Sequence, residues 1–232
     1  MERRRDRRYL PGRLFPLLAS IHVEGEPRSA KIIDLSPGGA GLQVSGPAYH
    51  EGTEAKLHLL LEDMWMEFPC RIAHVTLLRA GCRFGITAKF ENFAAQKAYL
   101  QLLQPVVLGS SLRPIPPEEV LQNDPDMHKL LFTGTPGTEL NVWRQGDIMG
   151  ELHGFLWRID DYLVRGDTVE GVLQITSRKP PGRPTKANPA GLPGKLSKEI
   201  SDEIRLLFRW TVLNLPKEVP GDIRSFVQGF AD

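Results

Sequence analysis

Apolar and polar residues alternate through much of the first 90 positions of the chain. This period of two predicts β-strands whose apolar side chains face a common core. The expected strands are residues 14–23, 28–33, 41–44, 55–61, 66–77 and 82–90. Glycine and proline mark the turns between them. Six short strands of this kind predict a closed antiparallel barrel or a sandwich, because closure removes exposed strand edges.

The pattern changes after residue 93, where a helix is expected over residues 94–103. Ala95, Tyr99, Leu102 and Leu103 would share one face of it and pack against the barrel. Prolines then accumulate without any period, which predicts a linker over residues 105–126. We therefore expect one domain over residues 1–104 and a second region over residues 127–232.

The second region begins with another β-rich stretch. Its candidate strands are residues 130–133, 138–144, 152–158, 162–165 and 168–177. Five prolines between positions 180 and 195 predict a flexible loop over residues 178–196. Ser197 is then a candidate N-cap for a helix whose face carries Ile200, Ile204 and Phe208 and which ends before Pro216.

A short final helix is expected over residues 223–230. The face of the longer helix that carries Ile204 must be buried, and the second β stretch is the nearest partner along the chain. This arrangement would make a small α+β region beside a mainly β domain. The expected fold is therefore mainly β with α.

Composition alone indicates an ordinary globular protein, with 41% hydrophobic residues, 25% charged residues and a net charge of +1. No apolar run approaches the length of a membrane span or a signal peptide, so a location in the cytoplasm is expected. Cys70 and Cys82 lie in strand-like segments without metal-binding spacing, which predicts two buried free thiols.

Charge is distributed unevenly along the chain. Residues 1–13 hold six arginines, and residues 178–198 hold six lysines and arginines without an acid. Arginine remains protonated and can grip a phosphate or the Hoogsteen edge of guanine with two hydrogen bonds. The N-terminal arm is therefore a candidate anion-binding segment.

A second polar motif follows the expected strand over residues 28–33. Asp34 and Ser36 flank a turn made by Pro37, Gly38 and Gly39. The Asp and Ser side chains can exchange hydrogen bonds with a base edge, while glycine allows close backbone approach. We interpret the arm and this turn as two halves of one site.

Together these residues resemble the PilZ domain, the bacterial receptor module for cyclic di-GMP, whose signature is RxxxR followed by [DN]xSxxG. Asp34, Ser36 and Gly39 match the second motif without a gap. Two pairs, Arg3/Arg7 and Arg4/Arg8, satisfy the first. Members often carry RRxxxR after a glutamate, which favours Arg4 and Arg8, with Arg3 and Arg7 as auxiliaries.

The resemblance extends to about residue 104 and implies a six-stranded antiparallel PilZ-type barrel. It also implies a receptor for cyclic di-GMP that is not an enzyme and needs no cofactor. The implied ligand-binding residues are Arg3, Arg4, Arg7, Arg8, Asp34, Ser36, Gly38 and Gly39. The second region would pass the ligand state to a protein partner. A barrel that has lost its ligand is disfavoured by the intact second motif.

DNA binding is the alternative, through the arginine arm or through residues 178–186. The latter segment resembles an AT-hook, with Gly182, Arg183 and Pro184 between basic flanks, but Pro181 stands where an AT-hook carries arginine. A missing arginine weakens minor-groove binding, so we favour a basic linker.

The sequence shows no signature of catalysis or metal binding. Its six histidines lack HxxxH and HExxH spacing, and phosphate-loop and nucleophile-elbow motifs are missing. We expect neither a catalytic residue nor a metal site.

Overall fold

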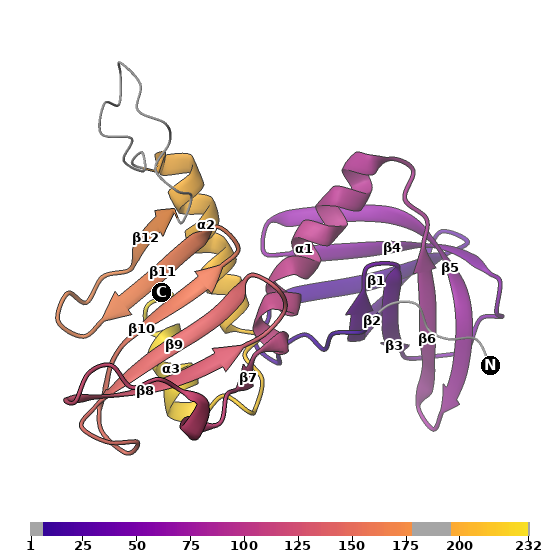
Figure 1. Cartoon of the computed structure of the whole chain (residues 1–232). Coiled ribbons are helices and arrows are strands. Elements are labelled where there is room, and N and C mark those ends of the chain that lie inside the picture. Colours follow the sequence, from indigo (N-terminus) through magenta and orange to yellow (C-terminus); the bar gives the residue numbers. More distant parts are fainter. Residues whose placement is uncertain (1–6, 178–195, 232) are drawn as a thin grey trace. The chain divides into compact units, whose positions relative to one another are not determined.

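A computed structural model describes residues 7–177 and 196–231 of the chain (Figure 1). The chain divides into two compact units, Met1–Val107 and Leu108–Asp232. We call them the N-terminal and C-terminal units. The long predicted loop lies almost wholly outside the described residues, as do Arg3 and Arg4.

The N-terminal unit is a closed antiparallel barrel. Its strands are β1 (Leu17–Val23), β2 (Glu26–Ser36), β3 (Gly39–Val44), β4 (Glu54–Leu61), β5 (Met64–Leu78) and β6 (Gly81–Ala88). They follow the order β1-β2-β3-β6-β5-β4, and β1 pairs with β4 to close the sheet. The predicted barrel is therefore confirmed.

Alternation along the strands fills the barrel, as the apolar pattern predicted. The apolar residue at every second position points inward and is fully or nearly fully buried. The buried set includes Ile21, Val23, Leu42, Val44, Leu57, Leu59, Leu61, Phe68, Ile72 and Phe84. Cys70 and Cys82 are also buried free thiols, and burial raises the pKa of Cys70 to about 12.

Two β-bulges change the faces that simple alternation predicts. One shifts the register between Ile32 and Asp34, so β2 continues to Ser36 where a strand end at residue 33 was expected. The other lies between Ile72 and His74. Strict alternation along residues 66–77 would place His74 on the inward face with Ile72, but its side chain is exposed because of this bulge.

Helix α1 (Phe93–Ser111) packs on the barrel through Tyr99, whose ring contacts Phe68 and Phe90. The expected helix end near residue 103 is wrong, because α1 continues through Pro105. A proline inside a helix costs about 3 kcal/mol or more. Val106 and Leu108 beyond it are almost completely buried, and this burial offsets the cost.

After α1 the chain runs through short elements. Strand β7 (Arg113–Pro114) pairs with β8 (Met127–Thr133), and a 3-10 turn, η1, covers Pro117–Glu119. The side-chain amide of Gln122 donates to the carbonyl of Lys129 and accepts from its N–H. These two hydrogen bonds satisfy the Lys129 backbone as a neighbouring strand would. That residues 105–126 act as a linker stays a prediction.

The C-terminal unit contains an antiparallel sheet in the order β12-β11-β10-β9-β8-β7. We call it the C-terminal sheet. Its other strands are β8 (Met127–Thr133), β9 (Thr138–Gln145), β10 (Leu152–Ile159), β11 (Tyr162–Asp167) and β12 (Gln174–Ser177). The last strand is shorter than predicted because the Asp167 carboxylate accepts from the N–H groups of Val169 and Glu170, which turns the chain there.

Helices α2 (Lys198–Val212) and α3 (Gly221–Gln228) cover one face of this sheet. Ser197 caps α2 by accepting from the N–H of Ile200, as predicted. Ile204 and Phe208 join a core with Phe155 and Trp157, which confirms the expected α+β region. None of the described helices is both long and apolar enough to cross a membrane.

Candidate functional site

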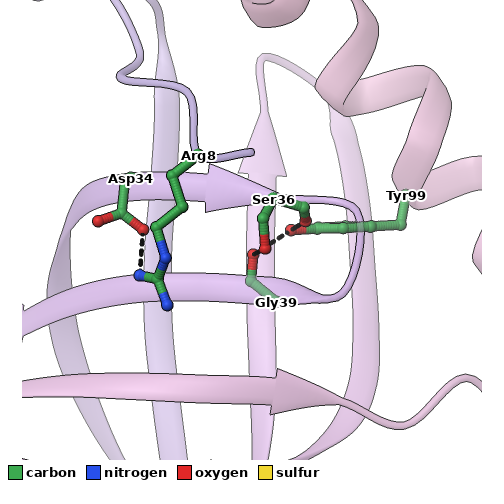
Figure 2. Close-up of polar contacts among 5 residues, drawn as sticks. All are labelled: Arg8, Asp34, Ser36, Gly39 and Tyr99. Atoms are coloured by element: carbon green, nitrogen blue, oxygen red, sulfur yellow. Dashed lines mark hydrogen bonds and ion pairs between the residues drawn. The ribbon is translucent and has the colours of Figure 1, made fainter. Parts of the chain in front are cut away.

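The site begins with an ion pair between the arm and the barrel. Nη1 of Arg8 lies 2.6 Å from Oδ1 of Asp34 (Figure 2). The Arg8 side chain is 37% exposed and that of Asp34 is 20% exposed. Exposed pairs of this kind contribute at most about 1 kcal/mol, so a ligand can open this pair at small cost.

The bulge in β2 determines where Asp34 points. Ile32 pairs with Leu42 and Asp34 pairs with Gly41, so the extra residue Ile33 re-aims the aspartate. A Cβ atom at Gly41 would lie 2.9 Å from both Asp34 carboxylate oxygens. The missing side chain at Gly41 therefore makes room for the Asp34 carboxylate. Sequence reasoning missed this role, because the pairing partner of Asp34 is not visible in the motif.

The arm is joined to the barrel next to Asp34. Tyr9 and Leu35 exchange two backbone hydrogen bonds, each 2.8 Å long. This bridge fixes the backbone one residue from both Arg8 and Asp34, which explains why their side chains meet. The Arg7 side chain stacks over the Tyr9 ring, with its guanidinium carbon 5.6 Å from the ring centre.

The turn after Asp34 is a two-residue hairpin between Ser36 and Gly39, with Pro37 and Gly38 at its tip. Ser36 Oγ donates to the carbonyl of Gly39 across the turn. The carbonyl of Gly38 accepts from the N–H of Ala88 at 2.9 Å. Ser36 is buried, so in this structure it shapes the turn.

Tyr99 holds the same turn from α1. Its hydroxyl lies 2.9 Å from the carbonyl oxygens of both Ser36 and Gly39 (Figure 2). Burial raises the pKa of Tyr99, so the phenol stays protonated and remains a donor. The sequence placed Tyr99 on the packing face of a helix, but it gave no signal for a hydrogen bond to a turn more than 60 residues away.

Gly39 is required by a close backbone approach. A Cβ atom there would lie 2.0 Å from the carbonyl oxygen of Ile86 on β6, a distance that no side chain tolerates. The glycine thus lets β3 and β6 pair directly below the turn. Its place in the motif follows from the packing of the barrel.

Further cations lie along the outer face of β2 and β3. Lys31 pairs in register with Gln43, and both line a surface hollow of about 430 Å³ with Arg28, Ser29 and Ser45. Arg28 donates to the carbonyl of Pro47 and stacks on Tyr49 at 4.5 Å. Lys31 therefore adds a second cation on the strand that carries Asp34.

Of the predicted site residues, the structure brings together Arg8, Asp34, Ser36, Gly38 and Gly39. Arg7 is close along the chain but is directed to Tyr9. Arg3 and Arg4 lie outside the described residues. Within the described ranges, no group of three or more His, Cys, Asp or Glu side chains could hold a metal ion.

The arrangement combines a guanidinium and a carboxylate on an accessible outer face. Arg8 can bind a phosphate or the O6 and N7 atoms of guanine. Asp34, an acceptor only, fits N–H donors and repels phosphate. A ligand with both anionic oxygens and N–H donors can use both groups.

Replacing Tyr99 with phenylalanine should lower the free energy of unfolding of the barrel by about 1–3 kcal/mol. The change leaves two buried carbonyl oxygens, those of Ser36 and Gly39, without their shared donor. Urea unfolding followed by circular dichroism measures the difference. Leu100→Ala, on the exposed side of the same helix, is a control that should change stability much less. Equal stability of Tyr99→Phe and the parent would contradict the assigned role.

Residues 2–100 match the family model described as the PilZ domain. This match includes the arm, Asp34, Ser36, Gly39 and Tyr99, and it leaves residues 101–232 unmatched. A search of curated protein sequences finds no matching relative.

Several solved structures are similar to the chain. The PilZ domain of YcgR from Escherichia coli with c-di-GMP shares 15% identity at a TM-score of 0.40, covering 45% of this chain and 92% of that one. The K. pneumonia MrkH–c-di-GMP complex shares 19% sequence identity at a TM-score of 0.42, and the match covers 47% of this chain and 53% of MrkH. PlzA of Borreliella burgdorferi in complex with c-di-GMP shares 10% sequence identity at a TM-score of 0.29, and the match covers 70% of this chain and 81% of PlzA.

Proposed function

We propose that this protein is a receptor for cyclic di-GMP and that Arg8 and Asp34 contact the ligand, because residues 2–100 match the PilZ domain family model. The observation that carries the proposal is their meeting at 2.6 Å beside the Ser36–Gly39 turn. Arg8 of the first motif and Asp34 of the second thus lie together on one outer face of the barrel. We expect the ligand to be cyclic di-GMP, which the PilZ signature implies.

The chemistry of the ligand suits these groups. Cyclic di-GMP carries two phosphates, which attract Arg8, and two guanines, whose N–H groups can donate to Asp34. In the described structure Arg8 donates one hydrogen bond to Asp34. Binding then replaces an exposed ion pair by charge-assisted hydrogen bonds to the ligand, which are roughly twice as strong as neutral ones.

Ser36 and Gly39 have a different part in the proposal. Ser36 Oγ is engaged inside the turn, and Gly39 allows the close approach of β3 and β6. We assign both to the shape of the turn rather than to a direct polar contact. Arg4 and Arg8 remain our proposed RxxxR pair, with Arg3 and Arg7 as auxiliaries.

DNA binding through the basic arm makes the opposite prediction for Asp34. Replacing Asp34 with alanine should weaken cyclic di-GMP binding by about tenfold or more, because a charge-assisted hydrogen bond to guanine is lost. The same change removes a negative charge and should leave binding to duplex DNA equal or tighter.

Fluorescence anisotropy with each labelled ligand, at two salt concentrations, measures both affinities. Retention of parental cyclic di-GMP affinity by Asp34→Ala, together with strongly salt-dependent DNA binding, would favour the DNA reading instead. The AT-hook-like residues 178–186 lie outside the described residues, so that part of the alternative rests on sequence alone.

We assign the C-terminal unit to signal output through a protein partner. The unit has its own core and lies outside the family match, as expected of an attached output module. Hydrogen exchange with and without cyclic di-GMP should show protection in residues 7–45 and a further change within residues 108–231. Protection from exchange confined to residues 7–45 would contradict the proposal that cyclic di-GMP binding changes the C-terminal unit.

A further inference from the structure

Apolar side chains gather at one end of the C-terminal sheet and are exposed to solvent. They are Leu121, Ile148, Met149, Val169 and Val172. Met149 is 85% exposed and Val169 is 81% exposed. They come from three loops, residues 120–126, 146–151 and 168–173, and we call their combined surface the loop-end surface.

Strand direction places these loops at the same end. Met127 at the start of β8 pairs with Gln145 at the end of β9, and Asp167 at the end of β11 pairs with Gly154 in β10. The N–H of Gly146 donates to the carbonyl of Asp126, which joins the first two loops. Figure 1 shows all three turns at the end of the sheet where β9 and β11 finish.

The loops are held in shape by their own hydrogen bonds. Asp147 Oδ1 accepts from the N–H of Met149 at 2.8 Å. Asp167 does the same for Val169 and Glu170, and the N–H of Thr168 donates to the carbonyl of His153. Preformed loops lose little conformational freedom when a partner binds. The exposed apolar side chains are therefore presented in a form ready for contact.

The three loops themselves carry only negative charge, and two cations outside them contact the third loop: Arg165 pairs with Asp167 at its start, and Arg205 of α2 donates to the carbonyl of Leu173. The three loops contain Asp124, Asp126, Asp147, Glu151 and Glu170 and no lysine or arginine. Arg144, which donates to the carbonyl of Gly150, is buried and paired with Asp222. An apolar surface bordered by acids attracts partners that are both apolar and basic.

We propose that the loop-end surface binds a protein segment that carries apolar side chains together with lysine or arginine. A second copy of this chain would bring the same acids against each other, and nucleic acids and anionic lipids would be repelled as well. This proposal does not depend on cyclic di-GMP binding.

A library of random peptides of about 16 residues, displayed on phage and panned against the full chain, tests the proposal. Enriched peptides should combine apolar residues with lysine or arginine. Their affinity should fall about tenfold or more for the triple variant Ile148→Ser/Met149→Ser/Val169→Ser and also for Glu151→Lys. The single charge variant keeps the test valid if the triple variant fails to fold.

The matched control is Leu77→Ser/Phe93→Ser, which makes the same change at side chains of the N-terminal unit that are 75% and 78% exposed. It should bind the peptides as the parent does. Enrichment of acidic or neutral peptides, or equal binding by all variants, would overturn the proposal. So would a concentration-dependent dimer in sedimentation velocity that the triple variant loses, because the occupant would then be a second copy.

Discussion

Replacing Arg8 with alanine is expected to weaken cyclic di-GMP binding by about 1.5–3 kcal/mol, which is roughly 10- to 150-fold in affinity. Arg8 forms an ion pair with Asp34, with 2.6 Å between Nη1 and Oδ1. Its loss removes a charge-assisted contact to the ligand. Stability should hardly change, because the ion pair is exposed and weak. Calorimetric titration and a thermal melt measure the two effects separately.

Two further variants control this experiment. Arg79→Ala removes an exposed arginine from the turn between β5 and β6 and should bind cyclic di-GMP as the parent does. Arg7→Ala tests the other candidate pair. Loss of binding in Arg7→Ala with parental binding in Arg8→Ala would assign the motif to Arg3 and Arg7 and would contradict our choice.

Replacing Gly39 with alanine is expected to destabilise the barrel by about 3 kcal/mol or more. The new Cβ would lie 2.0 Å from the carbonyl oxygen of Ile86, so β3 and β6 must separate or shift. Separation would also disturb the acceptor that Gly39 offers to Tyr99. Ligand binding should be lost together with stability, because Asp34 lies on β2 only two residues before this turn and pairs with β3.

Urea unfolding of the full chain measures the change, in the transition that belongs to the barrel. Gly85→Ala is the matched control on β6, because its Cβ would meet only the Cβ of His74 at an ordinary 3.4 Å. The control should stay close to parental stability. A Gly39→Ala protein as stable as Gly85→Ala would refute the close-approach account.

The barrel could be predicted because its strands alternate with period two and its turns carry glycine and proline. The bulges could not, since they depend on pairing across strands. Ile32, Ile33 and Asp34 read as the end of a strand, whereas pairing with Gly41 carries β2 to Ser36. The end of α1 was misplaced for a similar reason, because burial of Val106 and Leu108 outweighs the local effect of Pro105.

The sequence could predict those residues of the candidate site that belong to a motif with fixed spacing. Asp34, Ser36 and Gly39 were found by spacing, and Arg8 by its distance from Arg4 in the sequence. Tyr99 and Gly41 carry no local signal, because their roles arise only when α1 and β3 pack beside the turn. The reason that glycine is needed at position 39 likewise appears only from its contact with β6.

Calorimetric titration of the full chain with cyclic di-GMP is the direct test of the proposed receptor function, with cyclic di-AMP as the matched ligand that has the same sugar-phosphate ring. We expect saturable heat with cyclic di-GMP and much weaker binding of cyclic di-AMP, because adenine lacks the N1–H and N2–H groups of guanine that would donate to Asp34. Absence of binding to cyclic di-GMP, or equal affinity for both ligands, would contradict it.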